Sequence, residues 1–247
     1  MSQSLSFVPR FAVYLAPAEP YWRIGNQWLG RCAATDAVLD GQSRPLEWVR
    51  EPARYGLHAT LKAPFRLAGD ASPALLDTRA RAFATARRPF AAALALRDLR
   101  GFLAWGLDDS AANADGIRQM HALADAAVRD FDDLRAPATP AELARRRPDA
   151  LPDAERRMLE RWGYPYVFDT FVFHITLSGQ LDPATMQSAR ASLRDLCGNL
   201  LQTPLRVWGI SLYVQPAEDA DFVVARHYGF DGSTVDGAGA SFLGARE

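Results

Sequence analysis

Lysine, histidine and cysteine are scarce in this chain of 247 residues, which contains one lysine, four histidines and two cysteines. Cys32 and Cys197 are too few and too far apart in the sequence for a zinc knuckle or a disulfide framework. No histidine-rich or carboxylate-rich spacing supplies an alternative set of ligands. We therefore expect no metal site, no cofactor and a reducing compartment.

Long apolar segments are also missing. The longest apolar run, Phe90 to Leu96, is far shorter than the roughly 20 residues that span a bilayer as a helix. The N-terminus lacks the basic start and apolar stretch of a signal peptide. These features predict a soluble, cytoplasmic protein that makes no contact with a membrane.

An excess of charge of either sign is absent, because 28 basic and 29 acidic residues give a net charge of −1 at pH 7. A protein that follows a long nucleic acid needs a basic surface, so this balance argues against nucleic acid as a partner. Apart from Lys62, every basic residue is an arginine. We interpret that bias as genomic base composition, whereas the position of the single lysine is informative.

The most informative feature present is a repeated tetrapeptide, His58-Ala59-Thr60-Leu61 and His174-Ile175-Thr176-Leu177. With four histidines and ten threonines, random placement gives about 0.16 His-x-Thr matches, and the chain has two. Both copies lie in segments that alternate like half-buried strands, residues 57–63 and 170–178. The alternation places each histidine on the same face as the threonine two positions later.

Two such strands that meet across a pseudo-twofold axis would form an acid–base site. Histidine titrates near neutral pH, so one imidazole can accept a proton while the other donates one. The hydroxyls of Thr60 and Thr176 can donate hydrogen bonds to phosphate oxygens without adding charge. The motifs therefore predict displacement at phosphorus with His58 and His174 as the catalytic pair, and they leave open which is the acid.

Further candidates for binding the substrate phosphate lie on the first motif strand and on the first and last predicted strands. Lys62 extends the polar face of residues 57–63, and a cation there would attract an anion. The first predicted strand supplies Arg10 and Tyr14, and the last two predicted strands supply two weaker candidates, Arg226 and Tyr213. His121 and His227 have no threonine partner, and we interpret them as structural.

The order of predicted elements indicates one bilobal domain over residues 1–247. Strands and helices up to about residue 134 form the first lobe, and a proline-rich helical insert over about 135–165 could carry a lid. The second lobe covers about 166–230, and a glycine-rich tail over 231–247 is predicted to be flexible. Strand–helix–strand order in both halves indicates a weak internal duplication.

Several stretches, together with the paired His-x-Thr strands, resemble a known group of proteins. They are Arg10–Pro17, Trp22–Gly30, Tyr55–Phe65 and Phe173–Gly179. The chain resembles the two-histidine (2H) phosphoesterase superfamily, which includes RNA 2′,5′ ligase-like proteins and cyclic phosphodiesterases. Within it, the chain is similar to a branch of phosphonate metabolism proteins (DUF1045) found with carbon–phosphorus lyase genes.

This resemblance implies an α+β fold in which two antiparallel sheets face a central cleft, with helices outside. It implies a metal-independent cyclic phosphodiesterase that acts on a small cyclic phosphate. In the carbon–phosphorus lyase pathway this substrate would be 5-phosphoribosyl 1,2-cyclic phosphate, opened to ribose 1,5-bisphosphate. Two alternatives stay open: processing of RNA ends that carry a 2′,3′-cyclic phosphate, and a non-catalytic module that binds a phosphorylated ligand.

Overall fold

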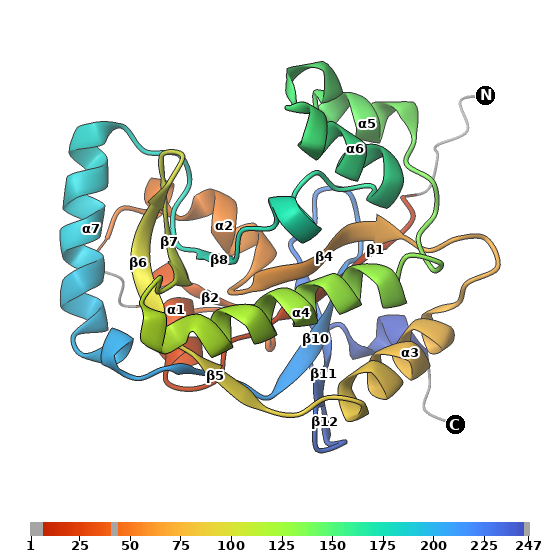
Figure 1. Ribbon diagram of the computed structural model, residues 1–247, viewed down its shortest axis with the longest axis horizontal. Helices are drawn as coiled ribbons and strands as arrows, with labels where there is room; N and C mark the ends of the chain where they lie inside the picture. The colour runs from red at the N-terminus through yellow and green to blue at the C-terminus, as the bar shows by residue number, and fades with distance from the viewer. Residues whose placement is uncertain (1–6, 41–43, 245–247) are drawn as a thin grey trace.

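The computed structural model describes residues 7–40 and 44–244, and its main feature is an antiparallel sheet of eight strands (Figure 1). In spatial order the strands are β12 (Thr234–Asp236), β11 (Val223–Gly229), β10 (Gly209–Gln215), β1 (Arg10–Leu15), β4 (Ala59–Arg66), β8 (His174–Thr176), β7 (Phe102–Leu107) and β6 (Leu94–Leu99). Two short pairs complete the strands: β2 (Arg31–Cys32) with β3 (Ala37–Val38), and β5 (Phe90–Ala92) with β9 (Leu205–Val207). The expected α+β class is confirmed.

The two strands that carry the repeated motif are neighbours at the centre of this sheet. β4 and β8 pair through Ala59 and Ile175, and this pair joins a five-stranded half to a three-stranded half. The two antiparallel sheets expected from the sequence are therefore two halves of one sheet. The motif strands form the seam between them.

The strands that form each half of the sheet are not those of the two lobes expected from the sequence. β1 pairs on one side with β4 and on the other with the C-terminal strand β10, while β8 pairs with β7 from the first part of the chain. The residues from Phe11 to Leu15 are buried on both strand faces, so other parts of the protein cover both sides of the sheet at β1. Strands close in sequence are thus divided between the halves, which alternation along one strand cannot indicate.

Helices pack against the sheet and supply most of the remaining core (Figure 1). They are α1 (Tyr21–Leu29), α2 (Arg50–Tyr55), α3 (Pro73–Thr85), α4 (Ala114–Asp130), α5 (Pro140–Arg145), α6 (Asp153–Trp162) and α7 (Pro183–Cys197). Short 3-10 helices occur at Leu46–Trp48, Ala111–Asn113, Pro148–Ala150, Phe168–Thr170, Leu200–Gln202 and Ala240–Leu243. Within residues 7–40 and 44–244, none of the helices has the length and apolar character needed to cross a bilayer.

The long helix α4 packs on β4 through an apolar stripe. Met120, Ala124 and Ala127 recur at helical spacing and are buried, as the sequence periodicity predicts. The alternate residues of the motif strands, Ala59 and Ile175, belong to the same core. Burial of these apolar faces leaves the histidine and threonine side chains on the opposite side of the sheet.

Helices α5 and α6 lie within the segment where the sequence predicts a helical insert. Thr139 and Glu142 form a reciprocal capping box at the start of α5, with Pro140 in the first turn. The two helices project beyond the sheet in Figure 1. Arg66 of β4 holds α5 in place through an ion pair with Glu142 at 3.1 Å.

The expectation of a flexible tail over 231–247 is wrong for residues 231–244, and residues 245–247 lie outside the described residues. β12 pairs with β11, and the side chain of Leu243 is buried in the main core. Gly237 and Gly239 allow close packing, because a Cβ at Gly237 would press on the Val224 carbonyl oxygen and side chain and one at Gly239 on the side chains of Val214 and Val223. Glycine content alone does not distinguish tight packing from looseness.

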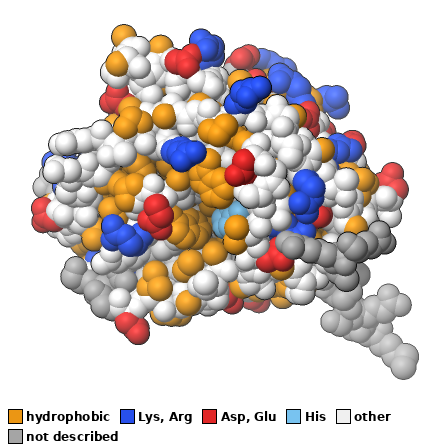
Figure 2. Space-filling view, turned by 90° about the horizontal axis from the view of Figure 1, so that it is seen from below, with side chains coloured by type: hydrophobic (Ala, Val, Ile, Leu, Met, Phe, Trp, Pro, Cys, Tyr) orange, Lys and Arg blue, Asp and Glu red, His pale blue; other side chains and the backbone are white. Residues whose placement is uncertain are grey.

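Charges of both signs are mixed over the surface, in line with the small net charge. On the face seen in Figure 2, basic and acidic side chains are interspersed between hydrophobic ones. Many arginines in the described part of the chain form ion pairs, among them Arg79 with Asp133 and Arg87 with Asp130. The abundance of arginine is therefore largely balanced locally.

Candidate active site

The pairing of β4 with β8 fixes how the two motifs meet. Because Ala59 lies opposite Ile175 in an antiparallel pair, Thr60 lies across from His174, and His58 lies across from Thr176. Each histidine is thus beside the threonine of the other motif. This cross-strand arrangement is the symmetric site that the repeat predicts.

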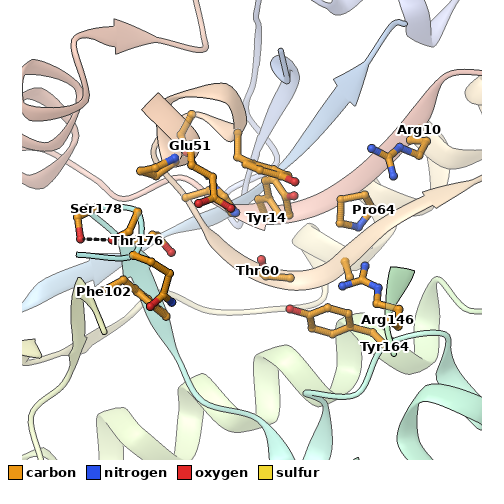
Figure 3. A pocket seen from close by; sticks show the side chains of 17 residues that line it. Arg10, Tyr14, Glu51, Thr60, Pro64, Phe102, Arg146, Tyr164, Thr176 and Ser178 are labelled. Carbon is orange, nitrogen blue, oxygen red and sulfur yellow. Dashed lines mark hydrogen bonds between the residues drawn. The ribbon is translucent and has the colours of Figure 1, made fainter. Parts of the chain in front are cut away.

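A cavity of about 330 Å³ lies over this seam (Figure 3). Its lining includes His58, Thr60 and Thr176, and also Tyr14 and Arg10. His174 is not among the lining residues, but its ring lies edge-on against that of Phe102, which lines the cavity, with 5.7 Å between the ring centroids. The structure therefore brings five of the predicted site residues to one cavity and places another, His174, beside it.

The two imidazoles are held in the same way. Nδ1 of His58 lies 2.8 Å from the carbonyl oxygen of Gly56, and Nδ1 of His174 lies 2.8 Å from that of Val172. A carbonyl oxygen only accepts hydrogen bonds, so Nδ1 carries the proton in each neutral ring. In both rings Nε2 is left as the atom that can accept a proton or, when protonated, donate one.

The protein environment favours the neutral form of both histidines. Burial, together with a smaller contribution from the nearby His174, lowers the pKa of His58 to about 4, although the hydrogen bond to the Gly56 carbonyl oxygen acts in the opposite direction. Burial also lowers the pKa of His174 below its ordinary value. A bound phosphate would favour the charged form of one ring, because a nearby opposite charge raises a histidine pKa.

Tyr14 forms one wall of the site and fixes the plane of His58. The two rings stack with 3.8 Å between their centroids and 19° between their planes. Burial raises the pKa of Tyr14 well above its ordinary value, so its hydroxyl remains a donor. Tyr213 packs against Tyr14, and its hydroxyl donates to the Leu57 carbonyl oxygen at 3.0 Å. It is not one of the described residues that line the cavity, so it supports the site from behind Tyr14.

Lys62 is not part of the site, contrary to the sequence prediction. Its side chain is 3% exposed, and Nζ donates to Asp132 at 2.6 Å and to the Val128 carbonyl oxygen at 3.1 Å. The cause is a β-bulge, since Tyr14 pairs with Thr60 but Val13 pairs with Lys62. One extra residue in β4 reverses the alternation and turns Lys62 to the other face.

Arg226 is also outside the site. Its buried guanidinium pairs with Asp77 of α3 at 2.7 Å and with Asp236 of β12. It is not among the residues that line the cavity in the described part of the chain. Two carboxylates contributed by other elements thus explain an arginine that the sequence suggested for substrate binding.

The remaining histidines lie outside the cavity, in agreement with their interpretation as structural. Nδ1 of His227 lies 2.6 Å from Ser211 Oγ, and its ring meets Trp22 edge-on. His121 lies edge-on against Phe171. No group of three or more histidine, cysteine, aspartate or glutamate side chains suited to a metal occurs in the described ranges.

Several residues at the cavity had no signal in the sequence. Glu51 comes from α2, Phe102 from β7, and Arg146 and Tyr164 from the insert. Further lining residues are Tyr55, Ser178 and Gln180. Ser178 follows His174 at the spacing that Lys62 has from His58, whereas the others lie at no repeating position relative to the motifs, and only the tertiary fold brings those to the cleft.

The fold and site together define an antiparallel α+β protein with a paired histidine–threonine cleft. Residues 60–223 match the family model described as "Protein of unknown function (DUF1045)", and the chain belongs to this family, as its resemblance predicts. The matched range contains Thr60 and the whole second motif and begins just after His58.

Two curated relatives have the name ribose 1,5-bisphosphate phosphokinase PhnN. The chain is 37% identical to the one from Laribacter hongkongensis (strain HLHK9) over 223 residues, which are 88% of this chain and 51% of the relative. It is 31% identical to the one from Janthinobacterium sp. (strain Marseille) over 237 residues, which are 90% of this chain and 51% of the relative. The chain therefore spans about half the length of the curated relatives it matches.

Solved structures give a weaker similarity. The chain is similar to Kluyveromyces marxianus Usb1 with uridine monophosphate, at a TM-score of 0.34 and 12% identity, over 87% of this chain and 98% of that one. A second structure of Kluyveromyces marxianus Usb1 gives a TM-score of 0.34 and 14% identity, over 89% and 99%. These TM-scores are too low to carry an argument about fold or activity.

Proposed function

We propose that this chain is a 2H-type cyclic phosphodiesterase in which His58 and His174 are the catalytic acid–base pair. The observation that carries the proposal is the matching state of the two imidazoles at the seam of the sheet. Each has its Nδ1 proton committed to a backbone carbonyl, its Nε2 free to exchange a proton, and a threonine of the other motif beside it.

The reaction needs one neutral and one protonated ring. The neutral Nε2 accepts a proton from water as the water oxygen attacks phosphorus, and the bond from phosphorus to the ring oxygen opposite the attack breaks. The Nε2–H of the other, protonated ring gives its proton to that leaving oxygen. The products are a phosphomonoester and a free hydroxyl, and proton exchange with solvent restores the starting state.

Thr60 and Thr176 have the role of neutral donors to the non-bridging oxygens. Hydroxyl groups held by the strand register stabilise charge that develops on phosphorus oxygens without raising the repulsion between two histidines. Tyr14 adds a third donor and keeps the His58 ring in plane. A metal ion is not required by this scheme, since the histidines supply both proton transfers.

The substrate we propose is 5-phosphoribosyl 1,2-cyclic phosphate, the compound implied by the resemblance to phosphonate metabolism proteins. Its hydrolysis at the 2-oxygen gives ribose 1,5-bisphosphate, which is the substrate in the name of both curated relatives. The chain matches about half of each relative, so one polypeptide there could join the formation of this compound to its use.

The kinase activity in those names is better assigned to the part of the relatives that this chain does not match. A P-loop kinase has a lysine after glycine in a glycine-rich loop, where backbone amides cradle the phosphates. The one lysine here, Lys62, lies between Leu61 and Ala63 and is paired with Asp132 in the core. A hydrolase is therefore the activity that this chain's own residues favour.

A substrate panel tests this proposal. The purified chain is incubated with 5-phosphoribosyl 1,2-cyclic phosphate, with a nucleoside 2′,3′-cyclic phosphate and with an RNA that ends in a 2′,3′-cyclic phosphate, each with and without EDTA. We expect fastest opening of the sugar phosphate, unchanged by EDTA, with ribose 1,5-bisphosphate identified by phosphorus NMR. Faster turnover of the RNA would instead favour end processing, and tight binding without turnover of any member would favour a binding module.

A further inference from the structure

A second cavity of about 270 Å³ adjoins the first and is rich in arginine. The two share Arg10, Tyr55, Pro64 and Arg146 in their linings, so they lie side by side along one cleft. The five arginines of the second cavity come from β1, β4, the α4–α5 connection and the end of α5; they are Arg10, Arg66, Arg135, Arg145 and Arg146.

Three of these arginines are neutralised by carboxylates. Arg66 pairs with Glu142 at 3.1 Å, Arg135 with Asp132 at 2.9 Å, and Arg145 with Glu218 at 3.5 Å. Such arginines are already paired and are poor sites for another anion. The structure accounts for each of them without a ligand.

The other two, Arg10 and Arg146, form no ion pair within residues 7–40 and 44–244, and they are the two that also line the catalytic cavity. Nε and Nη2 of Arg10 both donate to the neutral amide oxygen of Gln215, at 2.9 Å and 2.5 Å. The Arg146 guanidinium lies over the Tyr164 ring, 4.9 Å from its centroid. Neutral partners thus orient both groups and leave their charges uncompensated.

The cleft is therefore polarised along its length. In Figure 3, Arg10 and Arg146 lie on one side of Thr60, and Glu51 and Ser178 lie on the other. A carboxylate at the far end repels an anionic group, and two guanidinium groups at the near end attract one. A substrate with a doubly charged phosphomonoester at one end and a singly charged cyclic phosphate at the other would bind with the phosphomonoester at the arginines.

We propose that Arg10 and Arg146 form a phosphomonoester subsite, which holds a second phosphoryl group of the substrate while its cyclic phosphate lies against His58 and His174. This inference rests on the proposed function and specifies the substrate class as a sugar cyclic phosphate with a remote phosphomonoester. Two guanidinium groups suit a phosphate dianion, because their planar forks donate to two oxygens at once.

The insert gains a specific role from this arrangement. Arg146 directly follows α5, and α5 is anchored to β4 by the ion pair between Arg66 and Glu142 and by the bond from Arg66 to the Pro137 carbonyl oxygen at 2.8 Å. The catalytic strands can act on any cyclic phosphate that reaches them. The insert would select the cyclic phosphates that carry a second anionic group.

The test compares two substrates that differ by one phosphoryl group, 5-phosphoribosyl 1,2-cyclic phosphate and ribose 1,2-cyclic phosphate. The ratio of their kcat/KM values is measured for the native chain, for Arg10→Gln, for Arg146→Gln and for the double variant. We expect a ratio well above one that falls about 10- to 100-fold with each arginine removed, the size expected for a charge-assisted hydrogen bond. Arg145→Gln is the matched control, and its ratio should equal that of the native chain.

Binding of ribose 5-phosphate, measured by calorimetry, separates this proposal from the catalytic one. We expect the double arginine variant to bind it at least tenfold more weakly than the native chain and Arg145→Gln do, whether or not any substrate is hydrolysed. Equal affinity in the folded double variant, or equal kcat/KM of the native chain for both substrates, overturns the subsite. Hydrolysis of neither substrate overturns the proposed function, and the binding result then decides the subsite alone.

Discussion

At the scale of single residues, the same local hydrogen bond occurs at both proposed catalytic histidines. The carbonyl two positions before each histidine holds Nδ1, at Gly56 for His58 and at Val172 for His174. Backbone atoms cannot change protonation state, so they fix the tautomer at any pH at which the fold exists. The motif thus specifies not only which residues are present but which nitrogen is available.

Burial of His58 also makes stability depend on pH. Its pKa in the fold is about 4, below the ordinary 6.5, so the unfolded chain binds more protons between these values. The free energy of unfolding should therefore fall as pH decreases from 6.5 to 4, by up to about 3 kcal/mol from this group. We expect His58→Ala to lose less stability than the native chain between pH 7 and pH 4.5 in urea titrations, and parallel losses would contradict the assignment.

Lys62 gives a prediction that separates structure from catalysis. Its ammonium is buried against Asp132 and the end of α4, so Lys62→Met leaves a carboxylate without one partner. We expect the free energy of unfolding to fall by about 3 kcal/mol, as for other broken buried pairs. We expect kcat of the folded variant to stay within about threefold of the native value, since the side chain does not line the cavity. A hundredfold loss of kcat at unchanged stability would contradict this structural role and indicate that Lys62 acts in the active site.

At the scale of elements, the C-terminal hairpin is held by glycines that bring backbones together. A methyl group at Gly237 would press on Val224, whereas one at Gly69 would meet nothing within 4 Å. We expect Gly237→Ala to lower the free energy of unfolding by about 1–3 kcal/mol, the usual cost of overpacking. Gly69→Ala is the matched control and should change it by less than about 0.5 kcal/mol. Equal thermal stability of the two variants would show that the hairpin adapts freely.

Elements also mark where sequence reasoning succeeds and fails. Alternation correctly predicts which residues of each motif face the core, because Ala59 and Ile175 are buried while their neighbours are polar. It fails at Lys62, because a bulge depends on the partner strand β1 and leaves no trace within β4 itself. It fails at Arg226 for the same kind of reason, since Asp77 reaches it from a helix far away in sequence.

At the scale of the whole molecule, the candidate cleft is assembled from residues far apart in the sequence, from Arg10 to Gln180. The first motif, the insert and the second motif each contribute lining residues, as with Thr60, Arg146 and Thr176. The repeat predicts the two facing motifs, but it cannot predict Glu51 or Tyr164, whose positions depend on how α2 and the insert pack. The division of strands between the halves is likewise a property of the sheet, not of any one segment.

The same view explains how one fold can combine general chemistry with selective binding. The seam between β4 and β8 carries the proposed acid–base pair, and the adjoining arginine-rich cavity carries the proposed selectivity. The two are linked through Arg10, which lies on β1 directly beside the motif strand. Substitutions in the insert should therefore change the preference among cyclic phosphates more than they change the rate at which a bound cyclic phosphate is hydrolysed.

The central claim is that His58 and His174 together open a cyclic phosphodiester. The most direct measurement is the rate of hydrolysis of 5-phosphoribosyl 1,2-cyclic phosphate by His58→Ala, His174→Ala and the double variant, with His121→Ala as a control outside the cavity. We predict that each single change at the motif lowers kcat at least about 100-fold, as for loss of a general acid or base, with folding intact by circular dichroism. We predict that His121→Ala keeps the native rate, and native activity in a folded double variant would contradict the account.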